Sequence, residues 1–384
     1  MNSPRSFDVV LGGEQAGSYA AVLGGWLGIK QRWEVGTPQE RAALLAEALR
    51  FGAEGLALVQ QATTDSSPLV RRRALQLLWT AEQRDGYWLM DNLGTLRGHT
   101  KAVSGVILNR QGSAIISCGY DRTIRLWDRA TQQMVNKLKD HSDLVTGIAL
   151  SPDQETLVSS SRDRTVKIWH LPTGELRQTL TGHYGYVNSV AISPDGETIV
   201  TGSQDSTIKL WHLPTGAEIR TIKAHTNLVN AVALSPDGKT IVSCSWNTMI
   251  RVWDRESGRL RWELVGHSAR VWAFAVSHCG RFLFSGSRDR TIRIWDIVEG
   301  KYCRELEGHK GEVRAIIVTP DDRYLISASF REIKIWDLTT NQDIHTLRGH
   351  LNVINTLAFL PDQMLLVSGG DDYTLQLWGI PGNR

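Results

Sequence analysis

The chain has 384 residues, of which 41% are hydrophobic and 22% charged, and its formal net charge at pH 7 is only +3. These values are ordinary for a soluble globular protein and indicate no strong electrostatic attraction to nucleic acid or membranes. The longest apolar stretch falls short of the ~20 residues that a membrane span needs, and no signal-peptide pattern opens the chain, so we expect neither membrane insertion nor export. Four cysteines without a CxxC pair argue against disulfides or a zinc site and favour a reducing, cytoplasmic setting.

Residues 1–86 are expected to form a small α-helical domain. Thr37 and Glu40 form a capping box with Pro38 at the first helical position, which predicts that a helix begins here. A second helix is expected over Ala53–Ala62, and a third from Ser67-Pro68 onwards. Glycine-rich segments at 9–13 and 21–25 lack the GxxxxGK[ST] pattern of a phosphate loop, so we expect no nucleotide cofactor.

The segment 65–78 resembles half of a HEAT-type helical repeat at Asp65, Pro68, Val70, Arg71 and Ala74. One such unit cannot bury its apolar face alone, so it must pack on the preceding helices, on the rest of the chain or on a partner. The basic run at 71–73 either binds an acidic surface or is a solvated helix face.

From residue 87 to the end, the sequence repeats. Histidines recur at His99, His141, His183, His225, His267, His309 and His350, and tryptophans at Trp127, Trp169, Trp211, Trp253, Trp295, Trp336 and Trp378. The step is 42 residues, except for one step of 41 residues between His309 and His350. In the third copy, alternation and turn residues predict strands at 187–193, 198–202, 207–212 and 218–222. Four short strands repeated seven times predict the blades of a β-propeller.

Gly-His and Trp-Asp pairs recur in these units, for example at 266–267 and 295–296, and the units resemble WD repeats from roughly Trp88 to the end. The resemblance implies a mainly β fold, a seven-bladed propeller over residues 87–384. It also implies that the strand-like segment Tyr87–Leu96 closes the ring by completing the last blade. Together with the glycine-rich segments and the helical repeat, the chain resembles WD-repeat proteins of filamentous cyanobacteria, which implies a bacterial cytoplasmic scaffold.

Each unit also repeats a His, a Ser or Thr, an Asp and a Trp. A catalytic relay is needed once, so its recurrence favours a structural role, and the resemblance implies a buried hydrogen-bonded chain in each blade. The residues assigned to these sets are His99, Asp121, Trp127, His141, Asp163, Trp169, His183, Thr201, Asp205, Trp211, His267, Asp289, Trp295, His350, Asp372 and Trp378. The fourth copy has Asn247 in place of Asp, which can still hydrogen-bond, and the sixth has lost the Asp, so we expect blade six to be the least rigid.

The family resemblance implies that partners dock on the face that carries the Gly-His loops and the turns before each Asp. Nine residues at such positions, here called the rim residues, are Tyr120, Arg162, Tyr186, Trp246, Arg270, Trp272, Arg288, Arg314 and Phe330. Aromatic residues and arginine are enriched at interface hot spots. Residues expected near the channel mouth are Ser104, Thr146, Asn188, Asn230, Trp272, Arg314 and Asn355. The alternative is that these side chains stack on one another and close the channel.

The expected function is a non-catalytic scaffold for protein or peptide partners, with no metal or cofactor, and with the helical domain as a second candidate surface. A single-stranded nucleic acid could stack on the same residues, but Asp371, Glu312 and the modest net charge argue against it. An enzyme with its site at the channel mouth is a further alternative, which no unique catalytic set supports. The shortened sixth copy presents Phe330 beside Arg331, either to adjust the docking face or through neutral drift.

Overall fold

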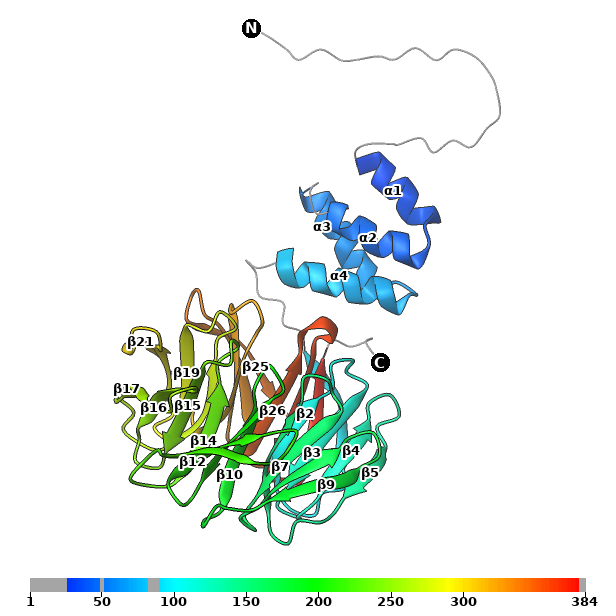
Figure 1. The fold of residues 1–384 in the computed structure, drawn as a ribbon. Helices are drawn as coiled ribbons and strands as arrows, with labels where there is room; N and C mark the ends of the chain where they lie inside the picture. Colours follow the sequence, from blue (N-terminus) through cyan, green and yellow to red (C-terminus); the bar gives the residue numbers. More distant parts are fainter. Residues whose placement is uncertain (1–25, 49–51, 82–89, 380–384) are drawn as a thin grey trace, which may run out of the picture. The chain divides into compact units, whose positions relative to one another are not determined.

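The computed structural model describes residues 26–48, 52–81 and 90–379, and the chain divides into two compact units, Met1–Gln83 and Arg84–Arg384 (Figure 1). The domain boundary expected between residues 86 and 87 falls in segment 82–89, outside the described residues, as do the glycine-rich segments at 9–13 and 21–25. Among the described residues, no helix is long and apolar enough to cross a membrane.

The described part of the first unit contains α1 (Trp26–Val35), α2 (Pro38–Ala48), α3 (Gly52–Gln61), a 3₁₀ turn η2 (Ala62–Thr64) and α4 (Pro68–Ala81). The three helices expected from the sequence correspond to α2, α3 and α4. Helix α1 was not predicted, because Gly28 interrupts its short apolar pattern and glycine weakens a helix by roughly 1 kcal/mol relative to alanine.

The capping box at the start of α2 forms as the sequence predicts. The backbone N–H of Thr37 donates to Oε2 of Glu40 over 2.8 Å, and the backbone N–H of Glu40 lies 3.4 Å from Oγ1 of Thr37. These bonds satisfy donors that a helix start otherwise leaves without partners.

The helices of the first unit pack on one another around a shared apolar cluster. Val70 and Ala74 of α4 are fully buried in it, together with Leu45 of α2 and Val59 of α3. Segment 65–78 therefore covers its apolar face on the preceding helices. Arg71, from the basic run, donates from Nη1 to the backbone carbonyls of residues 65 and 66 over 2.6 and 3.0 Å, so this arginine holds the loop before α4.

The described part of the second unit consists of seven antiparallel sheets of four strands, which we call blades one to seven. Blade one consists of β2 (Val103–Leu108), β3 (Ala114–Gly119), β4 (Ile124–Asp128) and β5 (Met134–Leu138). Blade two consists of β6 (Val145–Leu150), β7 (Thr156–Ser161), β8 (Val166–His170) and β9 (Glu175–Leu180). Blade three consists of β10 (Val187–Ile192), β11 (Thr198–Ser203), β12 (Thr207–His212) and β13 (Glu218–Lys223).

Blade four consists of β14 (Val229–Leu234), β15 (Thr240–Ser245), β16 (Ile250–Asp254) and β17 (Leu260–Leu264). Blade five consists of β18 (Val271–Val276), β19 (Phe282–Ser287), β20 (Ile292–Asp296) and β21 (Lys301–Leu306). Blade six consists of β22 (Val313–Val318), β23 (Tyr324–Ser329), β24 (Glu332–Asp337) and β25 (Gln342–Arg348). Blade seven is β26 (Ile354–Leu360), β27 (Leu365–Gly370), β28 (Thr374–Gly379) and β1 (Asp91–Arg97), with a 3₁₀ turn η3 (Pro361–Gln363) between β26 and β27.

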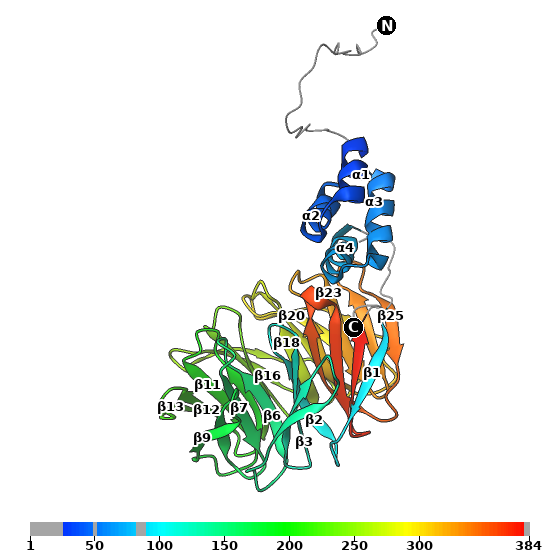
Figure 2. The ribbon, with the colours of Figure 1, turned by 90° about the vertical axis from the view of Figure 1, so that its right-hand side faces the viewer.

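The ring closes through β1, as the family resemblance implied. This strand pairs antiparallel with β28, and in Figure 2 the cyan β1 lies beside the red strands of the last blade. The first strands of successive blades contact one another around the ring, and β26 of blade seven contacts β2 of blade one. Closure leaves each blade between two neighbours, which protects the sheet faces from water and from other chains.

The apolar core lies between successive blades. Between blades two and three, Val158 and Ile168 of one sheet pack with Val187, Ile199 and Trp211 of the next. Equivalent clusters lie between blades one and two, three and four, four and five, five and six, and seven and one, so these blades are stabilised mainly by their neighbours. The first strands line the central channel, and their turns form the surface on which the expected site lies.

Candidate functional site

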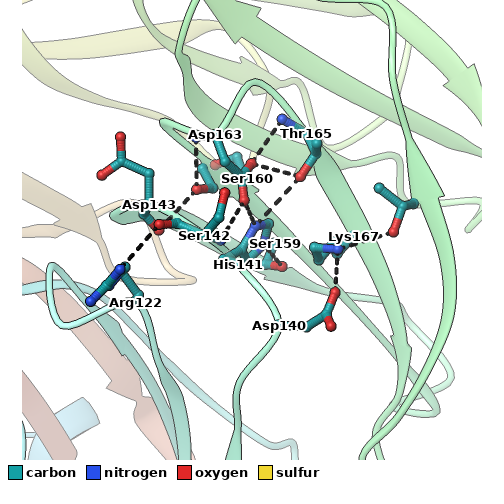
Figure 3. Close-up of polar contacts among 12 residues, drawn as sticks. Arg122, Asp140, His141, Ser142, Asp143, Ser159, Ser160, Asp163, Thr165 and Lys167 are labelled. Carbon is teal, nitrogen blue, oxygen red and sulfur yellow. Dashed lines mark hydrogen bonds and ion pairs between the residues drawn. The ribbon is translucent and has the colours of Figure 1, made fainter.

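Blade two shows how the repeated polar residues are arranged (Figure 3). Nδ1 of His141, just before β6, lies 2.7 Å from Oδ2 of Asp163 in the β7–β8 turn. Nε2 of the same ring lies 2.8 Å from Oγ of Ser159, which also accepts a hydrogen bond of 2.9 Å from Nε1 of Trp169. A continuous chain of hydrogen bonds therefore joins carboxylate, imidazole, hydroxyl and indole inside the sheet.

The carboxylate of this set is fully bonded. Besides His141, Asp163 accepts hydrogen bonds from the backbone N–H groups of Ser142 and Thr165, over 3.1 and 3.0 Å, and from the Thr165 hydroxyl over 2.6 Å. Burial alone would raise the pKa of Asp163, but the hydrogen bonds from His141 and Thr165 outweigh it and hold that pKa well below its usual range. The carboxylate thus fastens the β7–β8 turn to the sheet.

Four other blades have the same geometry. Their sets are His99–Ser117–Asp121–Trp127, His183–Thr201–Asp205–Trp211, His267–Ser285–Asp289–Trp295 and His350–Ser368–Asp372–Trp378, with Nδ1–Oδ2 distances of 3.0, 2.8, 2.7 and 2.8 Å. In the part of the chain that the structure describes, no group of His, Cys, Asp and Glu is placed to hold a metal ion.

Blade four lacks the carboxylate, and Asn247 does not replace it as a partner of the histidine. Nε2 of His225 lies 2.8 Å from Oγ of Ser243, but its buried Nδ1 has no hydrogen-bond partner among the described residues. Asn247 instead makes long contacts of 3.4 Å to Thr226 and Met249. Burial, reinforced by a nearby arginine charge, lowers the pKa of His225 to about 3.

Blade six brings a carboxylate near its histidine from an unexpected position. Nε2 of His309 lies 2.7 Å from Oγ of Ser327, and Nδ1 lies 3.6 Å from Oε1 of Glu332, which is too long for a hydrogen bond. Glu332 is the first residue of β24, and the sequence analysis did not single it out. Burial, reinforced by the Lys334 charge, lowers the pKa of His309 to about 3.

The missing residue of the sixth copy shortens the β23–β24 turn to two residues, because Ser329 pairs directly with Glu332. Phe330 takes a positive φ of 46°, a conformation that costs an ordinary residue roughly 1–2 kcal/mol. Phe330 is 48% exposed, and the guanidinium of Arg331 lies 4.9 Å from the centroid of its ring. The turn therefore presents a strained, exposed aromatic residue.

The channel mouth is shaped by one β-bulge in each first strand. In every blade the pairing register shifts immediately after the first residue of that strand. A bulge leaves one residue out of the ladder and redirects its side chain. The residues skipped by the register are Ser104, Thr146, Asn188, Asn230, Trp272, Arg314 and Asn355, and all seven line one cavity.

Five of these bulge residues donate a hydrogen bond to a backbone carbonyl of the next blade. Ser104, Thr146 and Asn188 donate to the backbone carbonyls of residues 145, 187 and 229 over 2.6, 2.6 and 2.8 Å. Asn230 and Asn355 continue the pattern to residues 271 and 103 over 3.2 and 3.1 Å. This series of bonds to backbone carbonyls is interrupted in blades five and six, whose bulge residues are Trp272 and Arg314.

The cavity at the mouth has a volume of about 460 Å³. We call it the channel-mouth cavity, and it is lined by the seven bulge residues with Tyr120, Arg162, Tyr186, Ser189, Gln204, Leu228, Ala231 and Trp246. Six of the nine rim residues therefore meet at one site. The other three do not line it. Arg270 stacks on the ring of Trp246, Arg288 pairs with Glu312 over 2.9 Å, and Phe330 lies in the β23–β24 turn of blade six.

The rim residues stack on one another and still leave the cavity open. The guanidinium of Arg162 lies 5.6 Å from the ring centroids of both Tyr120 and Tyr186. In blades four and five, the guanidinium of Arg270 lies 3.8 Å from the ring centroid of Trp246, whose ring meets that of Trp272 edge-on at 6.4 Å. Stacking therefore fixes the orientation of the groups that form the wall.

A family model described as WD domain, G-beta repeat matches the chain at residues 90–128, 132–170, 174–212, 216–254, 258–296, 300–337 and 341–379. These seven segments cover more than half of the chain. The protein belongs to the WD-repeat family. No curated protein matches the chain significantly.

Several polar groups around the WD-repeat cavity have no hydrogen-bond acceptor among the described residues. They are the buried N–H groups Nε of Arg162, Nε1 of Trp246, Nε1 of Trp272 and Nε of Arg314. A buried donor without an acceptor costs roughly 1–3 kcal/mol, so native proteins tolerate few of them. Four such donors on residues of one WD-repeat cavity contrast with the five complete polar sets, in which the histidine, hydroxyl, carboxylate and indole groups bond to one another.

Proposed function

We propose that this protein is a non-catalytic scaffold that binds protein or peptide partners at the channel-mouth cavity. WD-repeat propellers are typically interaction scaffolds. The observation that carries the proposal is the wall of the cavity, where Arg162, Trp246 and Trp272 are held by stacking and remain partly accessible. Side chains of this kind, fixed before binding, are typical of interface hot spots.

A non-catalytic role is supported by the way the titratable groups are used. In five blades the His–Asp pairs bond within their own sheet, as in the 2.7 Å contact between His267 and Asp289. The cavity wall instead carries hydroxyl, amide, indole and guanidinium groups, which bind a ligand by hydrogen bonds and stacking.

The helical unit is proposed as a second contact surface with HEAT-like character. Val35 and Leu69 are 86% and 42% exposed on it, respectively. We also propose domains 1–86 and 87–384, and a bacterial, cytoplasmic setting. The unpaired state of all four cysteines fits a reducing compartment.

Affinity purification with wild type, Trp272→Ala and Trp262→Ala tests the proposal. Trp262 lies on outer strand β17 and is 39% exposed, so it is a matched tryptophan away from the mouth. Partners recovered with wild type and Trp262→Ala should be lost with Trp272→Ala, and direct titration with a purified partner should reproduce the difference. Equal recovery by all three proteins would refute the site, and turnover of any substrate would refute the non-catalytic role.

A single-stranded nucleic acid is the second candidate, favoured by the position of Arg162 between Tyr120 and Tyr186. Phosphate-based binding would weaken steeply between about 50 and 200 mM salt. Binding of a labelled oligonucleotide with that salt dependence, and its loss in Arg162→Gln, would favour nucleic acid over protein partners.

A further inference from the structure

We propose that the channel-mouth cavity selects partner peptides that carry a carboxylate, and that Arg162 is the group that binds this carboxylate. The inference rests on the proposed function, because it names the chemistry of the partner at the same site.

Arg162 is held in place by its backbone and by aromatic contacts, with no acidic partner among the described residues. It belongs to the β7–β8 turn of blade two, where its backbone N–H donates to the carbonyl of Leu144 over 2.9 Å. Tyr120 and Tyr186, from the two neighbouring blades, lie 5.6 Å from its guanidinium on either side. Among the described residues it makes no ion pair, and its terminal nitrogens, unlike Nε, are not buried without partners. The planar end of the side chain is therefore available to the cavity.

The charges around the cavity leave Arg162 uncompensated. The other lining arginine, Arg314, pairs with Glu312 over 3.2 Å and also donates to Asn355 over 3.2 Å. Asp371, one of the two acids that argue against a nucleic-acid partner, accepts a hydrogen bond of 2.7 Å from Asn355. Neither acid lines the cavity, and no lining residue in the described chain is acidic. The cavity thus offers one fixed cation without a local counter-charge.

A single guanidinium fits a carboxylate better than a phosphate. Arginine binds carboxylates through two parallel N–H···O bonds, and one cation neutralises one carboxylate. A phosphorylated residue carries nearly two charges at neutral pH and is generally met by a cluster of arginines. Arg314 contacts Asn355 and Glu312, a carboxylate that it shares with Arg288, so Arg162 is the lining arginine without an ion pair among the described residues, and the observations favour the carboxylate.

The two tryptophans of the cavity indicate which other group the bound peptide carries besides the carboxylate. Trp246 and Trp272 offer aromatic surface to an apolar side chain, and their Nε1–H groups have no acceptor among the described residues. A peptide supplies backbone carbonyls as acceptors, and small rotations of interface side chains are common on binding. We therefore expect an acidic residue close to an apolar one in the bound segment.

The test is a selection of short random peptides, all amidated at the C-terminus, by the purified full-length protein. The best binder is then resynthesised with each carboxylate side chain replaced by its amide, and both copies are titrated. We expect the wild-type protein to bind the acidic copy about thirtyfold or more tightly than the amide copy, as for a desolvated charge pair.

Three variants test whether Arg162 causes this preference. Arg162→Gln should bind both copies equally, and Arg162→Lys should retain part of the preference. Arg164→Gln removes the same charge two residues away, from an exposed residue that does not line the cavity, and should behave like wild type. Thermal unfolding of each variant shows that the fold is intact.

Three outcomes would overturn the inference. One is equal wild-type affinity for the two copies, which would leave the proposed peptide-binding function standing. Another is an equal loss in Arg162→Gln and Arg164→Gln, which would indicate only general charge attraction. The third is displacement of the acidic peptide by inorganic phosphate or single-stranded oligonucleotide at lower concentration than by the peptide itself. If no peptide is selected and Trp272→Ala also captures the same partners as wild type, the proposed function fails as well.

Discussion

In the sixth blade, Nδ1 of His309 lies 3.6 Å from Oε1 of Glu332, whereas the complete sets have 2.7–3.0 Å between imidazole and carboxylate. The difference follows from the missing residue. Because Ser329 pairs with Glu332 across a two-residue turn, the carboxylate comes from a strand instead of from the turn. The blade keeps a negative group near its histidine but loses the hydrogen bond.

The first prediction concerns stability and pH. His225 and His309 have folded-state pKa values of about 3, compared with the ordinary 6.5. Between these values the unfolded state binds more protons, so the contribution of these two histidines to the free energy of unfolding is fully present above pH 6.5. It falls as the pH is lowered, by at most about 1.4 kcal/mol per pH unit for each histidine. The five set aspartates have lowered pKa values, so their contribution is lost only as the pH falls below the ordinary 3.8.

Urea unfolding between pH 7 and pH 5 measures this effect. The His225→Gln, His309→Gln double variant should show a flatter dependence of the free energy of unfolding on pH than wild type. An unchanged slope would show that these histidines are not the groups that titrate.

The second prediction is that Asn247→Asp stabilises blade four. A carboxylate at this position would give the unpaired Nδ1 of His225 an acceptor, and charge-assisted bonds of this kind contribute roughly 1–3 kcal/mol. Asp205→Asn in blade three is the matched reverse change and should destabilise. The urea concentration at which each variant is half unfolded at pH 7, compared with that of wild type, tests this prediction. A lower midpoint for Asn247→Asp than for wild type would contradict the role assigned to the carboxylate.

The third prediction is that Phe330→Gly separates stability from binding. Glycine adopts a positive φ freely, so relief at φ 46° should raise the free energy of unfolding by up to about 1 kcal/mol. The same change removes an exposed aromatic group from the docking face and should weaken partner binding. Stability is read from thermal unfolding and binding from titration. Unchanged affinity would assign the shortened turn to neutral drift.

The fourth prediction concerns ring closure. A protein that begins at residue 84 retains β1 and should give a folded, monodisperse propeller. A protein that begins at residue 98 lacks β1, exposes the edge of β28 and removes the buried Leu96, so it should aggregate or unfold. Circular dichroism and light scattering compare the two. A stable, monodisperse shorter protein would contradict the requirement for β1.

Much of the fold was readable from the sequence because the signals are local or periodic. The 42-residue spacing of His and Trp predicted the seven blades, and Thr37 with Glu40 predicted the start of α2. Glu332 was missed because deleting one residue changes which side chain meets His309 across the sheet. The sandwich of Arg162 could not be predicted, because Tyr120 and Tyr186 reach it from two other blades and no local pattern encodes their distance.

The central claim is that the repeated polar sets are internal and that recognition occurs at the channel mouth. Hydrogen exchange of the protein with and without a purified partner tests it most directly. The account predicts slowed exchange of backbone amides in the turns that hold Tyr120, Arg162 and Trp246, with no change in outer strands β9, β13 and β17. Protection confined to those outer strands, with unchanged exchange at the mouth, would contradict it.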